Sequence, residues 1–131
     1  MTLQEYFEHT KGLGVLATAD HEGRVNAAIY ASPHVMDEET VAFIMPDRLT
    51  HHNLQSNPHA AYLFRATEPG YKGKRLHLTK IREEEESELL YTLRRKSYDP
   101  ELEAKEGRKY LVFFKIDKVL PLIGPGLMGG E

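Results

Sequence analysis

The sequence contains no cysteine, which excludes disulfides, thiolate metal sites, iron–sulfur clusters and a cysteine nucleophile. It also lacks an excess of positive charge, because 17 Lys and Arg residues are set against 20 Asp and Glu residues, a net charge of -3. General nucleic-acid binding relies on such an excess, so we expect no nucleic-acid partner. No apolar run approaches the roughly 18 residues of a membrane span, and the N-terminus has no leader pattern. We therefore expect a soluble cytoplasmic protein without a membrane partner, in which any redox chemistry comes from a cofactor.

The length of 131 residues fits one domain with one core, and no repeat or linker divides it. We therefore treat 1–131 as a single domain. Residues 124–131, Gly-Pro-Gly-Leu-Met-Gly-Gly-Glu, are rich in glycine and are expected to form a flexible tail.

Short runs of alternating or branched apolar residues, separated by turn-forming residues, predict six to seven strands in antiparallel pairs. Few helices remain to cover a sheet of that size, so the fold class is α+β, mainly antiparallel β, and a small closed or partly open barrel is expected. The runs are 14–19, 24–32, 34–36, 40–45, 59–66, 74–81 and the first part of 109–122.

Two or three helices are expected. Residues 2–11 begin with a capping box, Thr2-Leu3-Gln4-Glu5. Residues 48–56 fit two helical turns, capped by Asp47 or Thr50 and ended by Asn57-Pro58. The clearest pattern is 83–97, where four glutamates precede an apolar stripe and three terminal cations, the order that suits a helix dipole. These glutamates are interpreted as a solvated helix start.

Seven histidines raise the question of a metal site, but no two of them are spaced i, i+4. The adjacent pair His51-His52 would point about 100° apart on a helix, so we predict no metal site. The serines lie in no nucleophile-elbow context, and we therefore name no catalytic side chain.

The segment 41–64 is more informative, because an apolar strand runs through a polar turn into a helix start. The N–H groups of that start could bind an anion such as phosphate, with Arg48, Thr50, His51 and His52 as additional donors. Taken alone, the segment is equally compatible with a capped connecting helix that faces solvent.

Residues 1–81 show a distinctive order of elements: the hairpin GVLATAD-x-x-G, the strands RVNAAIYAS and VAFIMP, a short helix ending NL-x-x-NP, and AAYLF. The most specific part is 53–61, Asn-Leu-Gln-Ser-Asn-Pro-His-Ala-Ala. In this order and these motifs the chain resembles the FMN-binding split-barrel proteins, the pyridoxamine 5′-phosphate oxidase-like superfamily.

The resemblance implies a six- to seven-stranded split-barrel homodimer with FMN at the subunit interface. It implies that the flavin phosphate lies against Arg48, Thr50 and His51, and that the ring lies along the second strand and beside Met45. Small Ala27 and Ala28 would let a flat ring approach the backbone, and Asn26 could bond it. The implied cofactor-binding set is Asn26, Ala27, Ala28, Met45, Arg48, Leu49, Thr50, His51, His52 and Asn53.

Two departures bear on function. Thr50 occupies a position that is often lysine in the family, and the C-terminal arginine-rich substrate motif of true pyridoxamine 5′-phosphate oxidases is not visible. We therefore expect a flavoprotein, an oxidoreductase acting on an unidentified small molecule or redox partner, and not on vitamin B6. Haem or deazaflavin remains an alternative cofactor, with His34, His51, His52 or His77 as a haem ligand. A cofactor-free dimeric interaction module is the other alternative.

A last expectation concerns the dimer seam. Residues 110–116 are apolar on both sides of a strand, and both sides need cover. We expect a second copy to cover one of them.

Overall fold

The computed structural model describes residues 1–94 and 107–124, and this part of the chain forms seven strands and three helices. Most of the expected tail, residues 125–131, lies outside the described residues. The helices are α1 (Leu3–His9), α2 (Leu49–Ser56) and α3 (Glu88–Arg94). The strands are β1 (Gly12–Ala19), β2 (Val25–Ile29), β3 (His34–Val35), β4 (Thr40–Pro46), β5 (His59–Ala66), β6 (Gly73–Glu85) and β7 (Lys109–Pro121). None of the three helices is long and apolar enough to cross a membrane.

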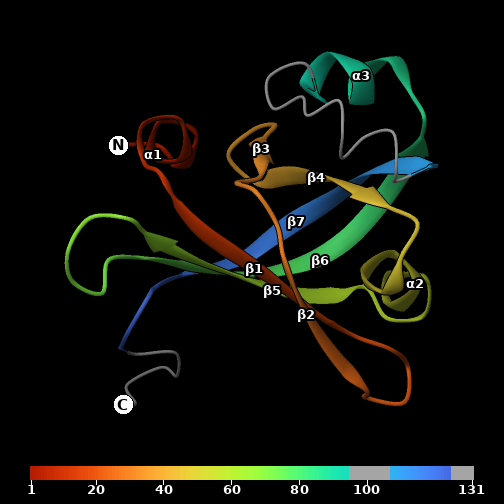
Figure 1. Cartoon of the computed structure of the whole chain (residues 1–131), viewed down its shortest axis with the longest axis horizontal. Coiled ribbons are helices and arrows are strands. Elements are labelled where there is room, and N and C mark those ends of the chain that lie inside the picture. The colour runs from red at the N-terminus through yellow and green to blue at the C-terminus, as the bar shows by residue number, and fades with distance from the viewer. Residues whose placement is uncertain (95–106, 125–131) are drawn as a thin grey trace.

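All seven strands form one antiparallel sheet in the order β2-β1-β5-β6-β7-β4-β3 (Figure 1). The edge strands β2 and β3 are consecutive in the chain, with only residues 30–33 between them. Five peptide steps span at most about 18 Å, whereas the edges of a flat sheet of this size would lie about 29 Å apart. The sheet must therefore coil back on itself, which confirms the expected mainly antiparallel α+β barrel.

The main core lies inside this coil. Inward side chains of β1, β4, β5, β6 and β7 pack together, and Phe7 of α1 joins them. Tyr62 holds the connection between the two edge strands, because its hydroxyl donates to the carbonyl oxygens of Tyr30 and Ala31 at 3.1 and 3.0 Å. The fully buried members with the largest side chains are Leu16, Val41, Met45, Tyr62, Phe64, Leu76, Leu78, Val112 and Phe114.

The first two helices lie where the sequence predicts them. The capping box of α1 is present, with the backbone N–H of Glu5 donating to Thr2 and the Glu5 side chain accepting in return. For α2 the predicted range of 48–56 agrees with the structure to within one residue, but the predicted cap is wrong. Arg48 is the N-cap residue, and among the residues the structure describes no side chain caps this helix.

The structure corrects the prediction of a helix over 83–97. Strand β6 continues to Glu85, the chain turns at Glu86 with a φ of 48°, and α3 begins only at Glu88. The glutamates pair with the apolar strand β7, from Glu83 opposite Val112 to Glu85 opposite Tyr110. This long-range ladder outweighs the local helix preference of a Glu-rich run. Residues 95–97 of the predicted helix lie outside the described residues.

The structure also corrects the expectation that a second copy covers one side of β7. Leu111 and Phe113, on the side of β7 away from the main core, form a second buried cluster with Ala42 and Leu90. Leu90 belongs to α3, which Figure 1 shows packed near β4 and β7, well away from α2. The chain's own helix therefore covers the apolar side that we expected a second copy to cover.

Candidate functional site

The candidate site begins at the N-terminus of α2, directly after β4. The first-turn N–H groups of a helix have no intrahelical acceptor, and α2 has no side-chain cap among the described residues. Arg48 and Leu49 at this end are exposed, whereas Thr50 is buried. A helix end of this kind offers backbone donors and partial positive charge to an anion.

Among the described residues, two hydrogen bonds between side chains attach α2 to the strands of the first hairpin. The Asn26 side-chain amide on β2 donates to the Thr50 hydroxyl over 3.5 Å, and Asn53 donates to Thr18 of β1 over 3.1 Å. Asn53 and Thr18 are both buried, so this second bond is shielded from water. The first Asn of the NL-x-x-NP segment thus locates the helix against β1.

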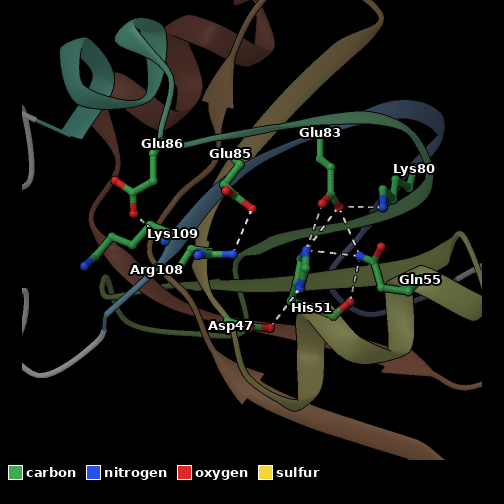
Figure 2. Close-up of polar contacts among 9 residues, drawn as sticks. All are labelled: Asp47, His51, Gln55, Lys80, Glu83, Glu85, Glu86, Arg108 and Lys109. Atoms are coloured by element: carbon green, nitrogen blue, oxygen red, sulfur yellow. Dashed lines mark hydrogen bonds and ion pairs between the residues drawn. The ribbon is translucent and has the colours of Figure 1, made fainter.

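His51 lies on the other side of α2, between two carboxylates. Its Nδ1 lies 3.3 Å from Asp47 Oδ1, and its Nε2 lies 3.0 Å from Glu83 Oε2 (Figure 2). The ring stacks on Tyr110 of β7 at 3.8 Å between centroids and is 8% exposed. Glu83 hydrogen-bonds Nε2 of this ring, whereas Asp47 lies within ion-pair distance of Nδ1.

Glu83 is itself held by several donors. Lys80 Nζ lies 2.7 Å from Oε1, and the Gln55 side-chain amide donates to the same oxygen over 3.0 Å. Burial alone would raise the pKa of Glu83, but the hydrogen bonds from Lys80, Gln55 and His51, with the charge of His51, lower it to about 2. The expectation that Glu83 is a solvated helix residue is therefore wrong.

The remaining residues of the implied cofactor-binding set differ in position and in exposure. Ala27 is exposed and Ala28 half-buried on β2, with Asn26 beside Thr50. His52 is exposed on α2. Met45 is fully buried in the main core. The structure therefore brings Asn26 and the start of α2 together, while the Met45 side chain is enclosed by other core residues.

The outer side of β2, β1 and β5 is apolar and uncovered, and we call it the outer apolar face. Val25 is 83% and Ile29 66% exposed. In the sheet register Val15 lies between Ile29 and Leu63, and Ala17 lies between Ala27 and Ala61. The apolar residues of this face are Leu13, Val15, Ala17, Ala19, Val25, Ala27, Ile29, Ala61 and Leu63, and exposed Arg65, opposite Leu13, borders them.

Sequence reasoning missed two features of this site. The alternation in 24–32 placed Val25, Ala27 and Ile29 on one side, but it could not show that this side is open. The link between Asp47, His51 and Glu83 joins residues up to 36 positions apart, and only the i, i+4 spacing of Asp47 and His51 hinted at it. Within residues 1–94 and 107–124, no group of three or more His, Asp or Glu side chains could hold a metal ion.

Comparison with known proteins connects this geometry to a fold. No protein-family model and no curated sequence matches the chain. Among solved structures, an FMN-binding protein from Syntrophomonas wolfei subsp. wolfei aligns with a TM-score of 0.76 and 17% identity, over 93% of this chain and 84% of that one.

Two further structures align over most of their length. A candidate pyridoxamine 5′-phosphate oxidase from Lactobacillus delbrueckii aligns with a TM-score of 0.65 and 18% identity, over 88% of each chain. An F420 reductase aligns with a TM-score of 0.64 and 16% identity, over 91% of this chain and 97% of that one. The chain therefore has the split-barrel fold of the FMN-binding and pyridoxamine 5′-phosphate oxidase-like proteins, as the sequence resemblance predicts.

Proposed function

We propose that this chain is an FMN-binding flavoprotein whose flavin phosphate binds at the N-terminus of α2. The observation that carries the proposal is the uncapped start of this helix, with exposed Arg48 at the N-cap and buried Thr50 bonded to Asn26. The likeness to an FMN-binding protein supports a flavin as the ligand. The oxidoreductase role, on a small molecule or a redox partner, is part of the same proposal.

The residues at the start of α2 can hold a phosphate and supply one fixed positive charge. The first-turn N–H groups of α2 can donate to its oxygens, and Arg48 can add a charge-assisted bond. The His51 ring is already engaged by Asp47 and Glu83, so its contribution is through its backbone N–H. Thr50 in place of lysine leaves Arg48 as the principal cation of the cradle.

The ring of a bound flavin fits along β2. Ala27 and Ala28 have small side chains, and Asn26 offers an amide that can hydrogen-bond a ring carbonyl or imide. Bound FMN would supply electron or hydride transfer. The chain's own residues would bind and orient it, with Arg48 at the phosphate and Asn26 at the ring, and none is assigned as an acid or base.

We also propose that a second copy of the chain covers the outer apolar face, which places the flavin at a subunit interface. A contiguous apolar surface of this kind on a sheet is typical of an interaction site. The three alanines at its centre, Ala17, Ala27 and Ala61, leave it flat enough for two such faces to approach. Asn26 lies between Val25 and Ala27 but on the opposite side of β2, where it bonds Thr50 of α2, so a partner seated on the outer apolar face borders the cofactor site across one strand.

Titration of the apoprotein tests the cofactor, with visible absorbance and fluorescence as readouts. We expect FMN to bind more tightly than riboflavin, which lacks the phosphate. Arg48→Ala should weaken FMN binding by about 1–3 kcal/mol, roughly 5- to 150-fold, and leave riboflavin unchanged. Lys11→Ala removes an exposed cation between α1 and β1 and is the matched control. Equal affinity for FMN and riboflavin would contradict the proposal.

Deazaflavin is the second candidate cofactor, favoured by the likeness to an F420 reductase. The same titration with F420 decides between the two. Tighter binding of F420 than of FMN, with an absorbance change in the deazaflavin band, would replace FMN in the proposal.

Light scattering tests the dimer. We expect the dimer mass for the wild type and the monomer mass for Ile29→Lys, because a buried unpaired ammonium is costly at an apolar interface. Ile81→Lys is the control, since Ile81 is similarly exposed, at 54%, but lies on β6 outside the outer apolar face. A wild-type monomer at working concentration would contradict the interface.

A further inference from the structure

We propose that His51 holds Asp47 away from the N-terminus of α2, so that this terminus stays open to an anion. In this arrangement Asp47 is an internal competitor for the anion site and His51 is a positioning residue. The inference rests on the proposed function, because the anion it concerns is the flavin phosphate.

Asp47 is placed to compete. It directly precedes the N-cap residue, and an aspartate at the start of a helix readily accepts hydrogen bonds from first-turn N–H groups. In the structure it does not do so. Its Oδ1 lies 3.3 Å from His51 Nδ1, although its side chain is 59% exposed and free of steric enclosure. The helix begins at the N-cap residue Arg48 without a side-chain cap hydrogen bond.

His51 cannot easily turn away from this contact. Its Nε2 is bonded to Glu83 at 3.0 Å, and its ring lies flat on Tyr110. Glu83 is fixed in turn by Lys80 and Gln55. The groups that face or border the imidazole are thus Asp47 before α2, Gln55 on α2, Lys80 and Glu83 on β6, and Tyr110 on β7 with its neighbour Arg108.

The two ring nitrogens have different roles. The contact of Nε2 with Glu83 anchors α2 to β6. The contact of Nδ1 with Asp47 orients the Asp47 carboxylate, which would otherwise reach the helix start. Loss of the imidazole frees Asp47 to occupy the N–H groups and to repel a phosphate there. Loss of Asp47 removes the competitor, so it should matter most when the imidazole is absent.

A double-mutant cycle on the full-length protein tests this coupling, with FMN and riboflavin as the probes. His51→Phe keeps a flat ring against Tyr110 and removes both ring nitrogens. We expect it to weaken FMN binding about 3- to 10-fold, the scale of a helix-end charge effect. Asp47→Ala in the His51→Phe background should restore most of that loss, while Asp47→Ala alone should change FMN affinity by less than about twofold. Riboflavin affinity should stay constant throughout.

Asp37→Ala is the matched control, because it removes one exposed carboxylate from the turn between β3 and β4. Circular dichroism checks folding, and His51→Leu replaces His51→Phe in the cycle if the latter does not fold. Equal gains from Asp47→Ala with and without His51 overturn the inference, since they show simple charge repulsion. A wild type that does not prefer FMN to riboflavin overturns the proposed function itself and with it this inference.

Discussion

The Nζ atom of Lys80 lies 2.7 Å from Oε1 of Glu83, although residues three apart on a regular strand point to opposite sides of a sheet. The register explains the contact. Lys80 lies opposite Phe114 and Arg82 opposite Phe113, so β6 gains one residue, Ile81, at this point. This β-bulge brings Lys80 and Glu83 to the same side, facing α2. The ion-paired cluster around His51 depends on that single extra residue.

Glu83→Gln tests the weight of this cluster in stability. The substitution removes the charge that Lys80, Gln55 and His51 all bond. We expect a loss of about 1–3 kcal/mol in the free energy of unfolding, measured by urea denaturation at pH 7. Glu85→Gln is the control, because Glu85 is half exposed, pairs with Arg108 at the surface and hydrogen-bonds the Tyr110 hydroxyl, and it should change stability by less than about 1 kcal/mol.

The titration of Glu83 should be visible in the pH dependence of the free energy of unfolding. Its pKa falls from 4.5 to about 2 on folding, so the unfolded chain takes up its proton first as the pH drops. The stabilisation is therefore complete above pH 4.5 and is lost as the pH falls from there through about 2. Denaturation curves between pH 7 and pH 2 should converge for the wild type and Glu83→Gln.

Asp20 titrates over the same pH range, so the Asp20→Asn variant is the control for that experiment. Hydrogen bonds from the backbone N–H and then the guanidinium of Arg24 hold its pKa at about 2. The Asp20→Asn variant should keep the Glu83 contribution and lose its own. A difference between wild type and Glu83→Gln that stays constant down to pH 2 would show that Glu83 is not the titrating group.

Gly14 and Tyr62 should prove strongly coupled. A Cβ added at Gly14 would overlap the Tyr62 hydroxyl oxygen and would come 2.6 Å from the Tyr30 carbonyl oxygen. We expect Gly14→Ala to destabilise the fold by about 1–3 kcal/mol, since the hydroxyl must leave its two backbone acceptors. Tyr62→Phe removes the closest clashing atom but keeps Cζ, so the double variant should be less destabilised than the sum of the two single variants in thermal unfolding.

Leu90→Ala tests whether α3 is the true cover of β7. Leu90 is fully buried against Leu111 and Phe113, so its truncation should cost about 2–5 kcal/mol. Light scattering should give an unchanged mass, because no subunit contact is expected on this side. If the variant kept normal stability but had a lower mass, the subunit interface would instead lie on β7.

Much of the fold could be predicted because the decisive signals are local. The capping box at Thr2, the turn between β1 and β2, and the Asn57-Pro58 break each act over a few residues, and they place α1, the first hairpin and the end of α2 correctly. The order of these elements also carried the resemblance that the solved structures confirm as a shared fold.

What the sequence determined by itself is thus the set of strands, two of the three helices and the split-barrel class. The tertiary structure decided the rest. Pairing with β7 made a strand of 83–85, the bulge at Ile81 aimed Glu83 at His51, and α3 covered the side of β7 assigned to a partner. These outcomes depend on contacts between residues about 20 or more positions apart in the chain. The free energy of such contacts outweighs local propensity, and no periodic pattern in the sequence reveals them.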